Sequence, residues 1–182
     1  MGAGSPEEYG LYFVWGETQG YTSDTSDGRS FDWASYKWCN GSYNTMTKYC
    51  INSGYGYNGF TDGLTELLPE DDAATANWGS PWRMPSLTQI EELLNSCTST
   101  WTTQNGVNGR KFVGPNGGTI FLPAAGYRWD GELYYAGSYG IYWSSTLYEG
   151  FPGRAYRLYF GSGSAGWGDS FRGRGHAVRP VR

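Results

Sequence analysis

The chain has 182 residues, 38% of them hydrophobic and 18% aromatic, and a formal net charge of −4 at pH 7. This length is typical of one domain spanning residues 1–182, and an acidic chain lacks the basic field that a nucleic-acid partner requires. No apolar run approaches the roughly 20 residues that cross a bilayer, so no membrane span is predicted. The 29 glycines favour tight turns and long irregular loops around a core of large aromatic rings.

The N-terminal third predicts one strand followed by long loops. Tyr9–Trp15 is a run of apolar and aromatic residues, typical of a buried strand. Residues 16–30 and 40–63 are rich in Gly, Ser, Thr, Asn and Tyr and therefore predict loops. A loop as long as residues 40–63 is uncommon unless it is functional or held by a cross-link.

The three cysteines leave two possibilities open for the second loop. Cys39 and Cys50 bracket the segment CNGSYNTMTKYC, and a disulfide between them would stabilise the fold by about 3 kcal/mol. Two free thiols are equally compatible with the sequence. Cys97 lies at an apolar position of a predicted helix, where a buried free thiol is expected. Three cysteines and one distant histidine make a poor zinc site, so neither a metal nor a cofactor is expected.

Two helices are predicted near the middle of the chain. Glu70–Trp78 begins with an acidic run that suits a helix N-terminus, an explanation we prefer to a calcium site. Ser86–Cys97 opens with Ser86 and Gln89 at the spacing of a capping box. Its apolar stripe, which we expect to face the core, consists of Leu87, Ile90, Leu93, Leu94 and Cys97.

The rest of the chain predicts hairpins and short strands. Asn-Gly pairs at 105, 108 and 116 are turn signals, and residues 127–139 and 161–168 predict loops. The predicted strand pieces are Lys111–Val113, Thr119–Leu122, Ile141–Ser145, Ala155–Phe160 and His176–Val181. Strands on both sides of two helices predict an α+β fold of small twisted antiparallel sheets with long irregular loops.

The segment AYRLYF has the alternation of a half-exposed strand. Tyr156, Leu158 and Phe160 share one face, which suits the core, and Ala155, Arg157 and Tyr159 share the other. An exposed Arg/Tyr pair is unnecessary for folding and suits ligand recognition. Harmless solvent exposure of both side chains is the alternative.

Catalysis has little support in the sequence. The single histidine, His176, could form a hydrolytic triad only with a nearby serine, such as Ser144 or Ser145, and an orienting carboxylate. A buried strand explains Trp-Ser-Ser-Thr more simply. We therefore predict no catalytic residue.

Family-like segments follow one another along most of the chain: YFVWGET, YKWC, LPEDDAATANWG, WRMPS, WTTQNGVNG, IFLPAAGYR, AGSYGIYWSST, AYRLYF and HAVRPVR. Together they resemble the Fibrobacter succinogenes major paralogous domain, which is related to the C-type lectin-like and formylglycine-generating-enzyme folds. The resemblance implies a C-type lectin-like fold and a surface or secreted bacterial or phage protein. It also implies a family strand before the first residues of this chain.

Residues 127–182 also resemble the variable proteins of diversity-generating retroelements, in which a fixed frame separates positions that are diversified from a template. The implied frame is Tyr142–Thr146, Ala155, Leu158, Phe160, Gly175 and Val178–Arg182. The implied displayed positions include Ile141, Leu147, Tyr148, Phe151, Arg154, Arg157, Tyr159, Asp169, Phe171, Arg174 and His176.

The predicted ligand-binding set joins most of these positions to charged and aromatic residues of the neighbouring loops. It consists of Arg128, Trp129, Asp130, Glu132, Tyr135, Ile141, Tyr148, Glu149, Phe151, Arg154, Arg157, Tyr159, Trp167, Asp169, Phe171, Arg174 and His176. Four members, Trp129, Glu132, Glu149 and Trp167, cannot arise by changing only the first two bases of an asparagine codon, so each of them must belong to the frame or arise by another kind of change.

The resemblance implies a non-enzymatic binding protein, extracellular or on a cell surface or phage particle, that displays a diversified face to a protein or glycan. An invariant adhesive or glycan-binding surface module is the first alternative. An enzyme related to formylglycine-generating proteins is the second, although Cys39, Cys50 and Cys97 do not match the cysteine motif of that chemistry.

Overall fold

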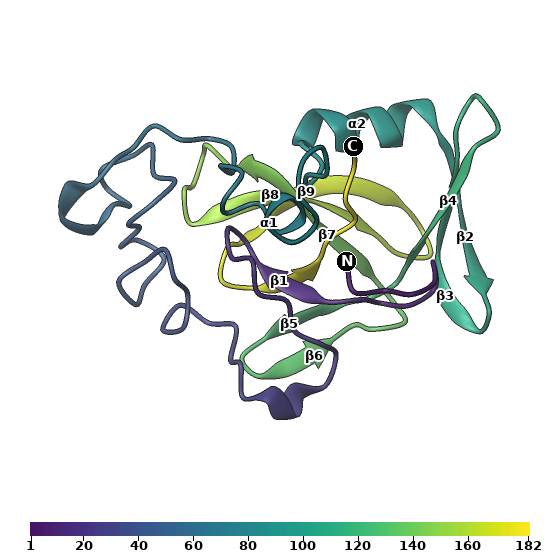
Figure 1. Ribbon diagram of the computed structural model, residues 1–182, viewed down its shortest axis with the longest axis horizontal. Helices are drawn as coiled ribbons and strands as arrows, with labels where there is room; N and C mark the ends of the chain where they lie inside the picture. The colour runs from purple at the N-terminus through teal and green to yellow at the C-terminus, as the bar shows by residue number, and fades with distance from the viewer.

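The computed structural model describes residues 1–182 and has a mixed α+β arrangement of two sheets and two α-helices (Figure 1). The larger sheet has the strand order β6-β5-β10-β7-β8-β9, with β1 paired to β10, and the smaller has the order β2-β3-β4. All pairs are antiparallel except β10 with β7. The predicted α+β class with antiparallel sheets is thereby confirmed. None of the helices is long and apolar enough to cross a membrane.

The elements in chain order are β1 (Tyr12–Val14), η1 (Thr25–Asp27), η2 (Tyr57–Gly59), α1 (Ala73–Trp78), α2 (Leu87–Ser96), β2 (Thr98–Gln104), β3 (Val107–Val113), β4 (Thr119–Pro123), β5 (Tyr127–Trp129), β6 (Glu132–Tyr134), β7 (Gly140–Leu147), β8 (Arg154–Phe160), β9 (Ala165–Phe171) and β10 (Gly175–Ala177).

Side-chain caps determine where both helices begin. The capping box of α2 is confirmed, because Ser86 accepts from the Gln89 amide and the Gln89 side chain accepts from the Ser86 amide. Helix α1 begins later than predicted, since Asp72 is its N-cap and accepts from the amides of Ala74 and Thr75. The preceding Asp71 points into the core, where it accepts from Tyr49 and pairs with Lys48.

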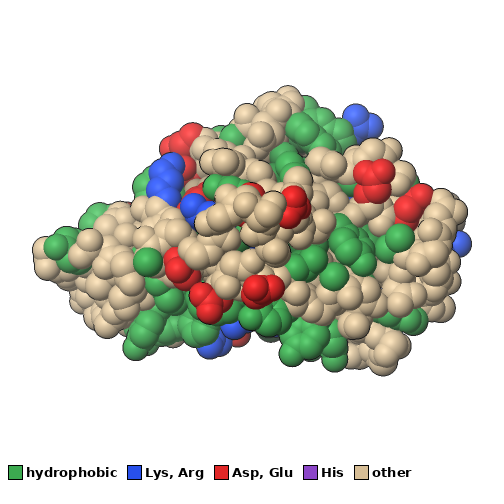
Figure 2. Space-filling model, turned by 90° about the horizontal axis from the view of Figure 1, so that it is seen from below, with side chains coloured by type: hydrophobic (Ala, Val, Ile, Leu, Met, Phe, Trp, Pro, Cys, Tyr) green, Lys and Arg blue, Asp and Glu red, His purple; other side chains and the backbone are tan.

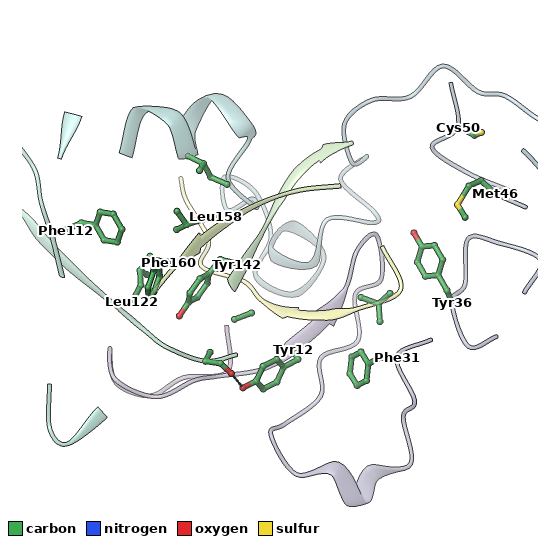
Figure 3. Close-up of a cluster of buried hydrophobic side chains, with 14 residues drawn as sticks. Tyr12, Phe31, Tyr36, Met46, Cys50, Phe112, Leu122, Tyr142, Leu158 and Phe160 are labelled. Carbon is green, nitrogen blue, oxygen red and sulfur yellow. Dashed lines mark hydrogen bonds between the residues drawn. The ribbon is translucent and has the colours of Figure 1, made fainter. Parts of the chain in front are cut away.

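One face of the larger sheet packs under α2. The main cluster of buried side chains includes Tyr142 of β7 and Leu158 and Phe160 of β8 (Figure 3). Ile90 of α2 belongs to the same cluster. Phe112 of β3 contacts the ring of Phe160 at 6.3 Å between centroids. Since side chains alternate along a strand, Arg157 and Tyr159 lie on the opposite face of β8.

The predicted partition of AYRLYF is correct for four of its six residues. Leu158 and Phe160 are buried, and Arg157 and Tyr159 are partly exposed. Ala155 is fully buried, because a second core cluster around Trp143 covers that end of the strand. Tyr156 is only half-buried, and its ring packs against Tyr148 and Trp167.

Two segments predicted as loops are strands. The hairpin β5–β6 turns at Asp130 and Gly131, whose φ angles of 50° and 79° suit a primed turn. An Asp-Gly pair is a hairpin signal, so the sequence does contain a local indication of this turn. Strand β9 pairs with β8 at seven consecutive positions although glycine alternates with larger residues along it. The hydrogen-bond ladder therefore outweighs the low strand propensity of this segment.

One of the three predicted Asn-Gly turns is wrong. Asn105 and Gly106 form the β2–β3 turn, with φ angles of 47° and 81°, and the third pair lies between β3 and β4. Asn108 and Gly109 instead lie inside β3, where a Cβ on Gly109 would come within 2.4 Å of the Leu122 carbonyl oxygen. Glycine is required there by close packing.

The candidate disulfide is not formed, and Cys39, Cys50 and Cys97 are all free thiols. The Cys39 thiol donates to the Trp33 carbonyl, and the buried Cys50 thiol donates to the Asn52 carbonyl. Backbone bridges from Met46 to Cys39 and to Gly56 hold the loop instead.

A buried arginine fastens this long loop to the larger sheet. Arg172, directly after β9, has no exposed surface. Its guanidinium donates to the Tyr36 hydroxyl and to the carbonyls of Lys48, Tyr49 and Pro152 at 2.8–3.0 Å. It also lies over the ring of Trp15, 4.8 Å from the centroid. The Arg172 side chain thereby joins residues 31–63 to the end of β9 and to the loop between β7 and β8.

Replacing Arg172 with Met should lower the free energy of unfolding by at least about 3 kcal/mol, because several buried oxygen acceptors would lose their donors. Urea denaturation measures the loss. Arg182→Met is the control; that arginine is exposed and should change stability by less than about 0.5 kcal/mol. Equal stability of the two variants would contradict the role of Arg172.

Candidate ligand-binding site

A pocket of about 330 Å³ opens on the face of the larger sheet that α2 leaves uncovered. We call it the tyrosine pocket; it is lined by Tyr127, Tyr135, Tyr139, Ile141, Arg157, Tyr159, Ser170, Arg174 and His176. The lining residues come from β5, β7, β8, β9 and β10 and the turns beside them. Side chains from five strands therefore meet in this pocket. Four of the lining residues are tyrosines and two are arginines, and both residue types are enriched in binding sites.

Backbone geometry presents the tyrosines. Tyr135 has a left-handed φ of 57°, and its carbonyl accepts from the amides of Ser138 and Tyr139. This turn brings the rings of Tyr135 and Tyr139 to 5.5 Å, where 58% and 47% of their surface stays exposed. Across the pocket, Gly166 leaves room for Tyr159, since a Cβ there would lie 3.2 Å from its hydroxyl.

Two arginines form a wall of the pocket without a carboxylate partner. Arg157 donates to the Asp169 backbone carbonyl, and Arg174 lies over the rings of Tyr127 and Trp129, 5.0 and 5.3 Å from their centroids. Neither forms a salt bridge, whereas the nearby Arg154 pairs with Asp169. Burial, followed by the charge of Arg174, lowers the pKa of the Arg157 guanidinium.

The floor of the pocket holds polar atoms that lack partners. His176 is 1% exposed and Ser170 is 4% exposed. Both ring nitrogens of His176 and the hydroxyl of Ser170 lack any hydrogen-bond partner. The imidazole packs against Trp143, 4.1 Å between centroids. The hydrolytic triad is therefore not assembled, since no serine or carboxylate forms a hydrogen bond with His176.

A second pocket of about 540 Å³ lies beside the long loop and is lined by Tyr43, Asn44, Asn52, Gly54, Tyr55, Phe151 and Phe171. The Arg174 guanidinium, which lines the tyrosine pocket, also lies over the ring of Phe171, 5.5 Å from its centroid. Arg154 lies over the same ring at 4.4 Å. The two pockets therefore belong to one surface, which we call the aromatic–arginine face.

Exposed hydrophobic area is divided into patches. Seen from the side on which the β5–β6 hairpin lies in Figure 1, hydrophobic side chains, tyrosines included, gather in separate clusters between polar atoms (Figure 2). Acidic side chains lie close to some of these clusters. No three His, Cys, Asp or Glu side chains come together as a metal-binding group.

Most predicted site residues are exposed or half-buried. These are Trp129, Asp130, Glu132, Tyr135, Tyr148, Glu149, Phe151, Arg154, Arg157, Tyr159, Trp167, Asp169, Phe171 and Arg174. Six of the predicted residues line the tyrosine pocket: Tyr135, Ile141, Arg157, Tyr159, Arg174 and His176. Tyr148 and Trp167 lie apart from it, against Tyr156 on the α2 side of the sheet.

Three predicted site residues are not displayed in the way expected. Ile141 and His176 are buried, so they contribute only to the pocket lining. Arg128 is fully buried; it pairs with Asp27 and lies over the ring of Phe31, which is a structural role.

The ligand-binding set predicted from the sequence does not include several residues that line the two pockets. In the tyrosine pocket these are Tyr127, Tyr139 and Ser170. Both tyrosines lie in the segment 127–139, YRWDGELYYAGSY, whose many aromatic rings are a signal in the sequence. The loop residues Tyr43 and Tyr55 of the second pocket carried only the signal of a long Tyr/Asn/Gly-rich loop.

The chain belongs to the family described as "Domain of unknown function (DUF8237)", whose model matches residues 90–181, about half of the sequence. The matched part runs from the middle of α2 through β10, and so includes every lining residue of the tyrosine pocket. No curated protein and no solved structure matches the chain.

His176 should make stability depend on pH. Burial, together with the charges of Arg157 and Arg174, holds its pKa well below the ordinary 6.5. Below about pH 6.5 the unfolded chain takes up a proton that the folded chain excludes, so stability falls as the pH falls. His176→Gln removes this contribution, by up to about 1.4 kcal/mol per pH unit.

Urea unfolding of the two proteins between about pH 8 and pH 5 tests this linkage. The stability of the native protein relative to His176→Gln should stay constant above pH 6.5 and decline below it. A constant difference over the whole range would contradict a neutral, buried imidazole.

Proposed function

We propose that this protein is a non-enzymatic ligand-binding module of C-type lectin-like fold that presents the aromatic–arginine face to a protein or glycan. In the sharper form of the proposal, a diversity-generating retroelement varies this face. The protein would then act outside the cell, on a cell surface or on a phage particle.

The observation that carries the proposal is a difference in burial between the implied frame positions and the implied displayed positions. Most of the implied frame is buried, namely Tyr142, Trp143, Ser144, Ser145, Ala155, Leu158, Phe160, Gly175 and Val178. The other frame positions, Thr146 and the chain end Arg179–Arg182, are partly or fully exposed. Of the implied displayed positions, Tyr148, Phe151, Arg154, Arg157, Tyr159, Asp169, Phe171 and Arg174 are partly exposed. Substitution at the second group would leave the core unchanged, as a diversified scaffold requires.

Besides the accessible frame positions, three implied displayed positions do not fit this division. Leu147 is fully buried in the second core cluster, and Ile141 and His176 are also buried. Within the proposal these three belong to the scaffold. The displayed set is then smaller than the resemblance implied, and it lies mainly on β8, β9 and the turns beside them. One remaining member, Tyr148, lies apart from the tyrosine pocket, against Tyr156 on the α2 side of the sheet.

An invariant adhesive or glycan-binding module would use the same surface without variation. Sequencing the surroundings of the gene separates the two forms. The retroelement form requires a near-copy of the 3′ end of the gene, differing mainly at adenines, beside a reverse transcriptase gene. If no such copy exists in the source genome, the face is invariant and the alternative stands.

Binding itself can be tested at the two most exposed rings of the tyrosine pocket. A glycan and protein array identifies a ligand, and surface plasmon resonance then compares variants. Tyr135→Ala with Tyr139→Ala should weaken binding by about thirtyfold or more, the effect of losing an interface hot spot. Stability should change by less than about 1 kcal/mol, because both side chains are largely exposed.

Tyr57→Ala is the matched control, since that tyrosine is 43% exposed but lies on η2, outside both pockets. It should leave binding unchanged. Equal loss in the control and the double variant, or full binding by the double variant, would refute the assignment of the binding face.

A further inference from the structure

We infer that the tyrosine pocket binds an acidic sugar, with the carboxylate of a uronic acid held between Arg157 and Arg174. The inference rests on the proposed binding function and names the chemical class of its ligand. Three features of the pocket carry it: unpaired cations, unpartnered polar atoms and ring-lined walls.

Two arginines give the pocket a local positive charge. The protein carries a net charge of −4, yet Arg157 and Arg174 line one small pocket and neither has a carboxylate partner. Arg174 has no hydrogen-bond acceptor at its Nε. Planar guanidinium groups match a carboxylate in geometry as well as charge. A bound anion would relieve the repulsion between the two arginines.

The polar atoms of the pocket floor require a ligand that can donate hydrogen bonds as well as accept them. A neutral imidazole offers one donor and one acceptor, and a hydroxyl offers both. His176 and Ser170 present these functions at buried atoms without partners. A carboxylate can only accept, so an aspartate or glutamate of a protein partner would leave acceptors of the floor unmet. Sugar hydroxyls donate and accept, and would match both groups.

The walls and the size of the pocket suit a single sugar ring. A volume of about 330 Å³ is at the small end of ligand pockets. The rings of Tyr127, Tyr135, Tyr139 and Tyr159 line it and offer flat apolar surfaces with polar tips. One pyranose ring carrying a carboxylate therefore suits this pocket better than an extended peptide.

The test uses methyl glucuronide and methyl glucoside, which differ at one carbon by a carboxylate. Titrations of the full chain are followed by NMR, with the His176 imidazole signals reporting on the pocket. The glucuronide should bind at least about tenfold more tightly than the glucoside, the worth of a charge-assisted hydrogen bond. The preference should weaken at high salt.

Two variants locate the binding. Arg174→Gln should abolish the preference for the glucuronide, whereas Arg154→Gln, which removes an arginine of the same face outside the pocket, should keep it. Equal binding of both sugars, no binding of either, or an unchanged preference in Arg174→Gln would overturn the inference. Binding of a polyglutamate peptide at the same imidazole in place of both sugars would also overturn it.

These outcomes are separable from failure of the proposed function. If the array ligand loses affinity in the Tyr135/Tyr139 variant but not in Arg174→Gln, the binding function stands and the acidic-sugar inference falls. If the tyrosine substitutions have no effect on any array ligand, the binding face itself is wrong.

Discussion

The buried guanidinium of Arg172 is the constraint from which the arrangement of the binding surface follows. The chain has few aliphatic residues with which to fix a long loop, and its cysteines are free. Arg172 supplies the missing link by donating to loop carbonyls and lying among aromatic rings. Its neighbours Phe171 and Arg174 line the two pockets. The residue that holds the loop therefore also sets the position of the surface.

The alternation of β8 explains how one strand serves both the core and the surface. Leu158 and Phe160 pack beneath α2, and Arg157 and Tyr159 face the pocket. The partners of Arg157 and Tyr159 on β9 are Gly168 and Gly166, which add no side chains to that face. Low side-chain density on β9 thus leaves room for the Tyr159 ring. The glycine content that obscured β9 in the sequence is part of the reason the pocket exists.

Local patterns predicted local structure, and long-range pairing decided the rest. The capping box of α2 and the Asn105-Gly turn were predictable because their signals lie within a few residues. Strand β9, the free state of Cys39 and Cys50, and the burial of Arg128 depend on partners far along the chain. The same division applies to the site: its residue types were predictable from composition, but their convergence required the strand order.

The unpartnered atoms beneath the tyrosines are the feature that favours the proposed binding role over a gap in packing. A buried polar group without a partner costs about 1–3 kcal/mol, and His176 and Ser170 together present three such atoms. An apolar residue such as phenylalanine at 176 would avoid that cost and still pack against Trp143. A fold of marginal stability carries such a cost more readily where another molecule can offset it. The polar floor, set between open tyrosine rings and two arginines without carboxylate partners, therefore supports the proposal that this face is half of a complementary surface whose other half is a ligand.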